Sequence, residues 1–103
     1  MSPEVSVADF PADDRYVIAV DGQPVGLLTY RLSEAVMAMM HAEISPAVER
    51  QGLGSSLVGF ALDDARAREL AVLPYCPFVR SYIADHPEHR DLVPEGSRAD
   101  FGL

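Results

Sequence analysis

The chain has no lysine, so its eight basic side chains are all arginines, set against sixteen Asp and Glu residues for a formal net charge of −8. A phosphate-binding P-loop, whose motif needs Lys before Ser or Thr, is therefore excluded. Nucleic-acid binding relies on clustered basic side chains to neutralise phosphates, so we expect no nucleic-acid partner. The acidic balance is compatible with a cationic partner such as an amine or a basic peptide, although solubility alone explains many acidic proteins.

Cysteine and long apolar runs are also scarce. The single Cys76 excludes an intramolecular disulfide and any multi-cysteine metal site. Together with His86 and His89 it has no familiar zinc-ligand spacing, so we expect no metal. No apolar run reaches the roughly 18–20 residues of a membrane helix and no signal peptide opens the chain. We therefore expect a cytoplasmic protein without a membrane partner, folded as a single domain over residues 1–103.

The first half of the chain has the pattern of β-strands. Residues 5–8 form a possible strand, and runs rich in β-branched and other apolar residues follow at 15–20, 25–32 and 36–44. Asp21-Gly22 is a strong hairpin-turn signal, and residues 33–35 indicate a second turn. The simplest arrangement of the last three strands is an antiparallel meander.

The second half changes to helical periodicity. Apolar residues between Gly52 and Glu69 recur as one stripe of a helix packed on a sheet. Residues 70–75 indicate a short strand, and Pro77 begins a second helix that ends before Pro87, because the residue preceding a proline avoids helical conformation. The tail over 94–103 is expected to be frayed. Strands followed by helix, strand and helix indicate an α+β fold, a mostly antiparallel sheet with helices packed on it.

Between the two halves lies the glycine-containing segment Glu49–Ser56, "ERQGLGSS". A dinucleotide fingerprint is excluded, because its third glycine would fall on Leu57. A G-x-G pair that opens a helix after a strand aims the amides of residues 50–56 at one anion, assisted by the helix dipole, and glycine lets the backbone approach closely. This geometry suits a pyrophosphate. The alternative is a helix that simply begins with glycines.

The run "EISPAVERQGLGSSLVGFALDDARAREL" resembles motif A of the GCN5-related N-acetyltransferases (GNAT superfamily). With "YVIAVDGQPVGLLTYRL" and "PYCPFVRSYIADHPEHRDLV", the resemblance covers residues 15–93 and is strongest to small single-domain proteins of the YjdJ type. It implies a GNAT-like fold that binds acetyl-CoA and transfers acetyl to an amine: an exposed lysine, a protein N-terminus or a polyamine. It also implies that main-chain groups of Ala42 to Ile44 hold the pantetheine, beside a bulge in that strand. The implied pyrophosphate loop comprises Arg50, Gln51, Gly52, Leu53, Gly54 and Ser55.

The loop departs from the family pattern at one position. Glu49 stands where the motif usually has Arg or Gln, and a carboxylate would repel a pyrophosphate. We expect Glu49 to point outward, with Arg50 or Gln51 in its place. If it faces the ligand instead, affinity for CoA should be poor. The alternative function is then a CoA-binding or protein-interaction module that kept the fold and lost the chemistry.

The resemblance and the residues give different candidates for the catalytic acid. The resemblance points to Tyr82, in the helix that begins at Pro77, although a tyrosine in mid-helix commonly belongs to the core. From the residues alone the candidate is Cys76, which precedes Pro77 as the N-cap of that helix. The helix dipole and Arg80 would favour its thiolate, which could relay or position the acetyl group. The alternative for Cys76 is a small apolar residue in the core.

The candidate bases are His41 and Glu43, which project to the same face of one strand because side chains alternate. Either could take a proton through a water molecule. Whether this is the cofactor face depends on the bulge, and a pair with a structural role only is the alternative.

Overall fold

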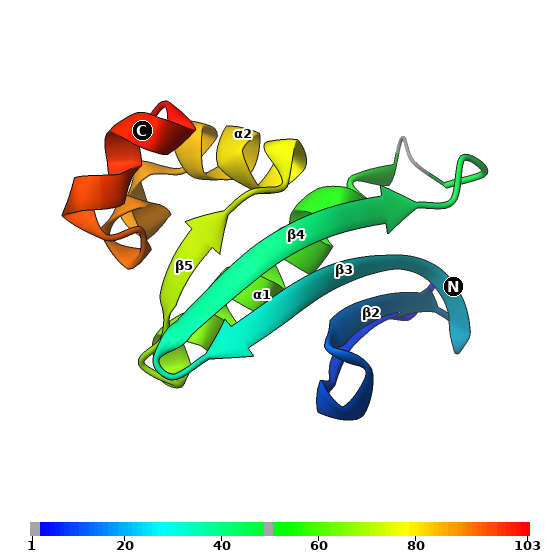
Figure 1. Ribbon diagram of the computed structural model, residues 1–103. Helices are drawn as coiled ribbons and strands as arrows, with labels where there is room; N and C mark the ends of the chain where they lie inside the picture. Colours follow the sequence, from blue (N-terminus) through cyan, green and yellow to red (C-terminus); the bar gives the residue numbers. More distant parts are fainter. Residues whose placement is uncertain (1–2, 49–50) are drawn as a thin grey trace.

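The computed structural model describes residues 3–48 and 51–103, which form a five-stranded sheet in the order β1-β2-β3-β4-β5 with α1 packed behind it (Figure 1). The strands are β1 (Val5–Phe10), β2 (Arg15–Val20), β3 (Gln23–Ser33), β4 (Val36–Ile44) and β5 (Ala71–Pro74). The helices are α1 (Leu53–Ala67) and α2 (Pro77–Asp85), with 3-10 segments η1 (Pro11–Asp13), η3 (Pro87–Leu92) and η4 (Glu95–Phe101). The predicted α+β fold with a mostly antiparallel sheet is confirmed.

The first four strands pair antiparallel in chain order, while β5 pairs parallel with β4. The hairpin between β2 and β3 turns at Asp21 and Gly22, whose φ angles of +51° and +81° are those a two-residue turn of type I′ requires. The predicted turn is thus confirmed. Parallel pairing of β5 follows from its connection, since α1 carries the chain back along the sheet before β5 begins.

The core lies between α1 and one face of the sheet. Alternation along the strands turns Tyr16, Ile18, Leu28, Tyr30, Met37 and Met39 inward, and all of these side chains are buried. The predicted helical stripe meets them, with Leu57, Val58, Ala61, Leu62 and Ala65 fully buried. Helix α2 adds Val79 and Ile83 at the edge next to β5. In the described part of the chain no helix is long and apolar enough to cross a membrane.

A β-bulge at Met40 shifts the register of β4. Tyr30 pairs with Met39 but Thr29 pairs with His41, so Met40 is the extra residue. Beyond the bulge, Ala42 lies opposite buried Leu28 and therefore faces the helices. The bulge expected in this strand is thereby confirmed.

The same stretch of β4 has a free edge. Pairing between β4 and β5 ends at Met39, which lies opposite Pro74. The last hydrogen bond at this end runs from the Cys76 N–H to the Met39 carbonyl, at 3.0 Å. The chain then turns away into α2. Within the described residues, no strand pairs with 40–44 on this side, so their backbone groups border the gap between β4 and α2.

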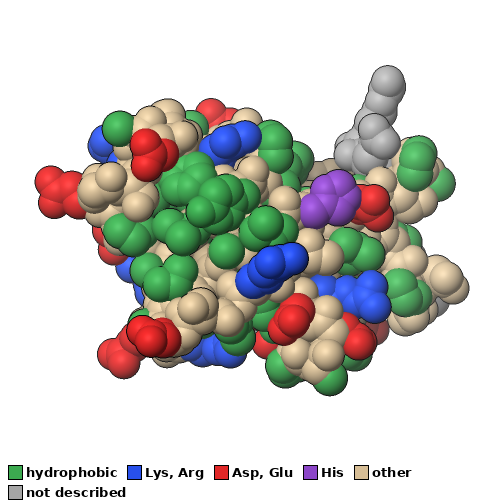
Figure 2. Space-filling model, in the orientation of Figure 1, with side chains coloured by type: hydrophobic (Ala, Val, Ile, Leu, Met, Phe, Trp, Pro, Cys, Tyr) green, Lys and Arg blue, Asp and Glu red, His purple; other side chains and the backbone are tan. Residues whose placement is uncertain are grey.

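The sheet face turned away from α1 has no helix over β2, β3 and β4 in the described ranges, and it faces the viewer in Figure 1. Figure 2 shows that side chains of both charges stand among apolar ones on this side of the molecule. We call it the open face.

The C-terminal segment differs from the expected frayed tail over 94–103. It forms η4, and the Leu103 N–H donates to the Arg98 carbonyl at 2.7 Å. The ring of Phe101 packs edge-to-face on Tyr75, with the ring centroids 5.3 Å apart. Phe101 and Leu103 are partly buried against the core, so apolar burial orders a segment whose sequence has no regular periodicity.

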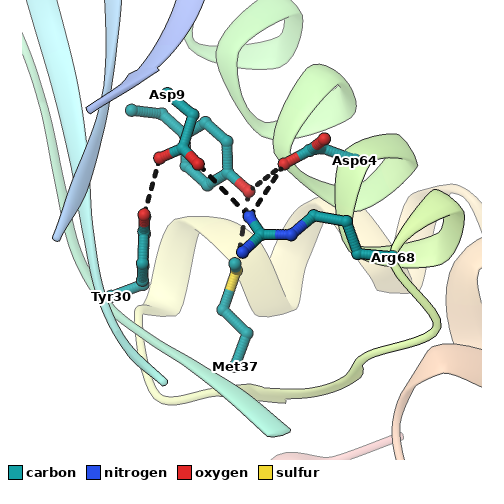
Figure 3. Close-up of polar contacts among 6 residues, drawn as sticks. Asp9, Tyr30, Met37, Asp64 and Arg68 are labelled. Carbon is teal, nitrogen blue, oxygen red and sulfur yellow. Dashed lines mark hydrogen bonds and ion pairs between the residues drawn. The ribbon is translucent and has the colours of Figure 1, made fainter. Parts of the chain in front are cut away.

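A polar network ties the first three strands to the C-terminal end of α1 (Figure 3). The Tyr16 hydroxyl donates to Asp64 at 2.7 Å, and the Tyr30 hydroxyl donates to Asp9 at 2.6 Å. Arg68 Nη1 donates to both carboxylates, at 3.2 Å to Asp9 and 3.3 Å to Asp64. Each buried hydroxyl therefore has an acceptor, and the guanidinium balances part of the acidic charge.

This network makes the stability of the protein sensitive to alkaline pH. Burial, and then the hydrogen bond to Asp64, raise the pKa of Tyr16 above its ordinary value. Because the folded state holds this proton more tightly, the contribution is complete below about pH 10 and is lost as the pH rises, at about 1.4 kcal/mol per pH unit. Urea unfolding between about pH 9 and 11.5 should show a shallower decline for Tyr16→Phe. The control is Tyr75→Phe, at a ring that is 49% exposed; an equal decline for both variants would contradict the prediction.

Candidate functional site

A cavity of about 400 Å³ lies between the free edge of β4, the first turn of α1 and the start of α2. Its lining consists of Ala42, Ile44, Gly52, Gly54, Ser55, Leu57 and Phe78. Five of the residues predicted to contact a cofactor lie in this lining: Ala42, Ile44, Gly52, Gly54 and Ser55. The structure thus brings together the two segments, one on a strand and one on a helix start, that the sequence analysis selected separately.

The first turn of α1 presents fewer unpaired amides than expected. The Gln51 N–H donates to the Val48 carbonyl at 3.1 Å, and the Ser56 N–H donates to the Gly52 carbonyl at 3.2 Å. The first bond belongs to the turn that leads into the helix and the second is the first bond of the helix itself. Of the amides at 51–56, those of Gln51 and Ser56 are therefore already bonded, and the candidates for an anion are those of 52–55, the positions that lack intrahelical partners at a helix start.

The two motif glycines are required for different reasons. Gly52 is the N-cap and has φ +74°, a left-handed conformation that favours glycine. A Cβ added at Gly54 would lie 2.8 Å from Cζ of Phe78, so this glycine allows α2 to pack closely against the first turn of α1. Leu53 between them is 4% exposed and its side chain belongs to the core, which leaves only its backbone for a ligand.

The predicted role of Arg50, and the question raised by Glu49, lie outside the described residues. Gln51 is exposed and described, but its side chain is not among those that line the cavity. The polar lining that the structure shows around the first turn of α1 is therefore backbone together with Ser55.

His41 and Glu43 lie on the open face. Their partners across β3 are Thr29 and Leu27, which face away from α1, and His41 Nε2 is 3.0 Å from Glu43 Oε1. Both side chains are more than half exposed. The bulge thus places the predicted bases on the side of β4 opposite to the 400 Å³ cavity.

A second and larger depression of about 870 Å³ lies on the open face over β2, β3 and β4, and we call it the open-face groove. Glu43 is part of its lining, and so are Ala42 and Ile44, which also border the first cavity. The end of β4 is therefore the wall that both cavities share.

The structure does not bring Tyr82 to either cavity. Its ring stacks on His86, with centroids 4.0 Å apart, and its hydroxyl lies 2.9 Å from a Cβ added at Gly59. Burial, followed by the charges of Asp63 and Glu88, raises the pKa of the Tyr82 hydroxyl. The aromatic side chain that does line the first cavity is Phe78, one turn earlier on α2.

Phe78 was missed by the sequence analysis. A signal was present, since an aromatic residue directly after Pro77 at a helix start can face the preceding helix, and Gly54 supplies the space. Nothing in the sequence alone paired these two positions.

Cys76 is the N-cap of α2, as predicted. It is 3% exposed and packs within the core, while its backbone N–H bonds to Met39 at the inner end of the free edge of β4. Cys76 is therefore not part of the cavity lining and lies where β4 and β5 separate. No cluster of three or more His, Cys, Asp or Glu that could hold a metal ion occurs in the ranges described.

Comparison with known proteins agrees with this arrangement. The model of the family described as GCN5-related N-acetyl-transferase matches residues 15–92, from the start of β2 through η3. The chain belongs to this family. The NMR solution structure of a GCN5-like protein from Staphylococcus aureus has the same fold, with a TM-score of 0.67 and 19% identity over 86% of this chain and 87% of that one. A search of curated protein sequences gave no match.

As a GCN5-related N-acetyltransferase, the chain has the family and the enzyme class that the motif around Gly52 and Gly54 predicted. The match spans β4, α1 and α2, the three elements that line the smaller cavity. Assignment of individual residues to catalysis or cofactor binding stays a prediction, as does the acceptor.

Contact between Gly54 and Phe78 predicts a strong coupling between these two positions. Gly54→Ala should destabilise the protein by about 1–3 kcal/mol, because the added methyl group overpacks the gap in which the Phe78 ring lies. In a Phe78→Ala background the same change should be neutral or slightly stabilising. Gly96→Ala, at a site with no atom within 4 Å of the added Cβ, is the control. Equal destabilisation by Gly54→Ala in both backgrounds, measured by urea unfolding, would show that Phe78 is not the obstacle.

Proposed function

We propose that the protein transfers the acetyl group of acetyl-CoA to a primary amine, with an exposed lysine, a protein N-terminus and a polyamine as the candidate acceptors. The observation that carries the proposal is the smaller cavity, where a helix start with unpaired amides faces a free strand edge. The membership of the chain in the GCN5-related family supports the same reaction class.

The residues of the smaller cavity fit the chemical parts of CoA. The amides of Gly52–Ser55 and the positive end of the α1 dipole suit a pyrophosphate. The unpaired N–H and C=O groups along 40–44 of β4 suit the amide groups of pantetheine, since a free strand edge offers ready hydrogen-bond partners. When bound, acetyl-CoA would supply the acetyl group from its thioester, and CoA would leave as the free thiol.

The positions of His41 and Glu43 support a role in removing a proton from the acceptor. An amine must lose a proton to act as a nucleophile, and a positioned base supplies this step. The two side chains are 3.0 Å apart and open to water, so a proton taken up by the Glu43 carboxylate or by His41 can pass to solvent. Glu43 lines the open-face groove, and we propose it as the primary base with His41 as its partner.

Neither candidate for the acid lines the smaller cavity. Tyr82 has its hydroxyl against α1 at Gly59 rather than in a cavity, and Cys76 is buried beside the free edge of β4. Of the two, Cys76 lies closer along the chain to the point where β4 and β5 separate, and we retain it as the candidate that positions the acetyl end.

The position of Tyr82 favours a second candidate function. A module that binds CoA without transferring acetyl would need the smaller cavity but no acid beside it. The two functions differ in whether acetyl-CoA is consumed or only bound.

Ser55→Asp tests the pyrophosphate site without weakening the fold. An acidic residue in the first turn of α1 complements the helix dipole, but it would repel a bound pyrophosphate. We expect the Kd for acetyl-CoA and for CoA, measured by calorimetry, to rise about tenfold or more. Ser55→Asn, which is similar in shape and neutral, should bind nearly as the natural protein does. Equal affinity in the Asp and Asn variants would place the pyrophosphate elsewhere.

Glu43→Gln tests the base. Removal of a general base should lower kcat for amine acetylation about a hundredfold, while the calorimetric Kd for acetyl-CoA stays unchanged because Glu43 lies on the opposite face of β4. Glu34→Gln, in the β3–β4 turn, removes the same charge and should keep full activity. Acetylation at the natural rate in Glu43→Gln would show that Glu43 is not the base. If the natural protein does not consume acetyl-CoA, the binding module is the favoured function.

A further inference from the structure

The charged side chains that line the open-face groove lie at its two sides. One row of paired residues crosses its floor, through Val17, Leu27 and Glu43, and Arg15 lies on β2 two residues before Val17. The acidic side chain of Glu43 thus stands at the β4 side, and the basic side chain of Arg15 stands at the β2 side. Two strand spacings and an offset of two residues along the strands separate them, roughly 12 Å.

Apolar side chains fill the floor between these two charges. Val17 and Leu27 are neighbours across β2 and β3, and Phe10, which is 47% exposed, borders the groove beyond them. An extended aliphatic chain laid across the strands would cover this floor. Its burial would contribute roughly 25 cal/mol for each Å² of apolar surface removed from water.

Arg15 shares the β2 side of the groove with Asp13, which lies in η1 and also lines the groove. Arg15 Nη2 is 4.0 Å from Asp13 Oδ2, and these side chains are 41% and 60% exposed. An exposed pair at this separation contributes little, so the guanidinium can turn into the groove. A guanidinium suits a carboxylate and repels an ammonium group.

The β4 side is where an acceptor amine would meet the acetyl group. Ala42 and Ile44 border both cavities, and the edge of β4 beyond Met39 is free of β5. An amine held beside Glu43 on one face is therefore separated from the smaller cavity only by the width of this strand edge.

We propose that the open-face groove binds the acceptor, and that the acceptor is a primary amine on an extended aliphatic chain whose far end is neutral or anionic. The ammonium group lies at Glu43, the chain crosses Leu27 and Val17, and the far end reaches Arg15. The proposal rests on the acetyl-transfer function above, and it narrows the acceptor class by excluding diamines and longer polyamines, whose second positive charge would face Arg15.

Three amines of similar length test this assignment. NMR titration of the labelled protein with CoA present, so that no acetyl transfer occurs, should give the tightest binding for 6-aminohexanoate, followed by pentylamine and then 1,5-diaminopentane. The shifted amide signals should be those of residues 15–17, 27 and 42–44. No binding of any amine at about 100 mM, or the tightest binding for the diamine, would overturn the proposal.

Arg15→Glu should reverse the order. The ratio of the Kd for the diamine to the Kd for 6-aminohexanoate should fall about tenfold or more, because the charge that faces the far end changes sign. Arg31→Glu is the matched control: it makes the same charge change on β3, outside the groove lining, and should leave the order unchanged. Arg15→Gln should give an intermediate ratio. The same reversal in Arg31→Glu would show that only the net charge matters and would overturn the proposal.

Failure of this proposal can be told apart from failure of the proposed function. Acetyl-CoA binding and consumption are measured without reference to Arg15, and the NMR titration needs no turnover. Consumption of acetyl-CoA with signals shifted outside the groove would overturn the acceptor site alone. Amine binding in the groove without any consumption would support the acceptor site and leave acetyl transfer as the failed part.

Discussion

One extra residue in β4 determines the arrangement of both cavities. Side chains alternate along a regular strand, but because Met40 is accommodated as a bulge, this alternation is shifted by one residue for every residue that follows it. Without the bulge, Ala42 and Ile44 would point to the open face and Glu43 would point toward α2. With it, small apolar residues border the gap beside the helices and a carboxylate stands on the opposite side. The two proposed substrates can then approach the same strand edge from opposite faces.

The two ends of α1 have different physical roles. At its C-terminal end, Asp64 accepts from the Tyr16 hydroxyl and Arg68 donates to Asp9 of β1, so this end is fixed to the sheet by charge-assisted hydrogen bonds. At its N-terminal end, Gly52 is exposed, while the buried Gly54 leaves space for Phe78. Because these hydrogen bonds fix the C-terminal end of α1 to the sheet, the helix keeps its position on the core although the amides of its first turn lack intrahelical partners.

Much of the secondary structure could be predicted from local sequence patterns. The strand bounds at 15–20 and 36–44 and the turn at Asp21-Gly22 follow from β-branched runs and from a dipeptide that tolerates positive φ. The helix of α1 follows from its apolar stripe.

The face of His41 and Glu43 could not be predicted, because it depends on where the bulge falls, and strand alternation is the same on either side of it. The tail was mispredicted since burial of Phe101 on Tyr75 is a long-range contact that leaves no periodicity. Tyr82 and Phe78 differ by one helical turn, too little for a sequence to decide which of them reaches a cavity.

The positive charge of the open-face groove is carried by a guanidinium, and the chain has no lysine. An arginine stays protonated at any ordinary pH and is a poor nucleophile, whereas a lysine at position 15 would place a second primary amine within a ligand's length of Glu43. Such a residue would compete with the acceptor and, once acetylated, would lose the charge that orients it. If the groove binds the acceptor as proposed, the site would not acetylate its own side chains, and its selectivity would stay constant over repeated turnover.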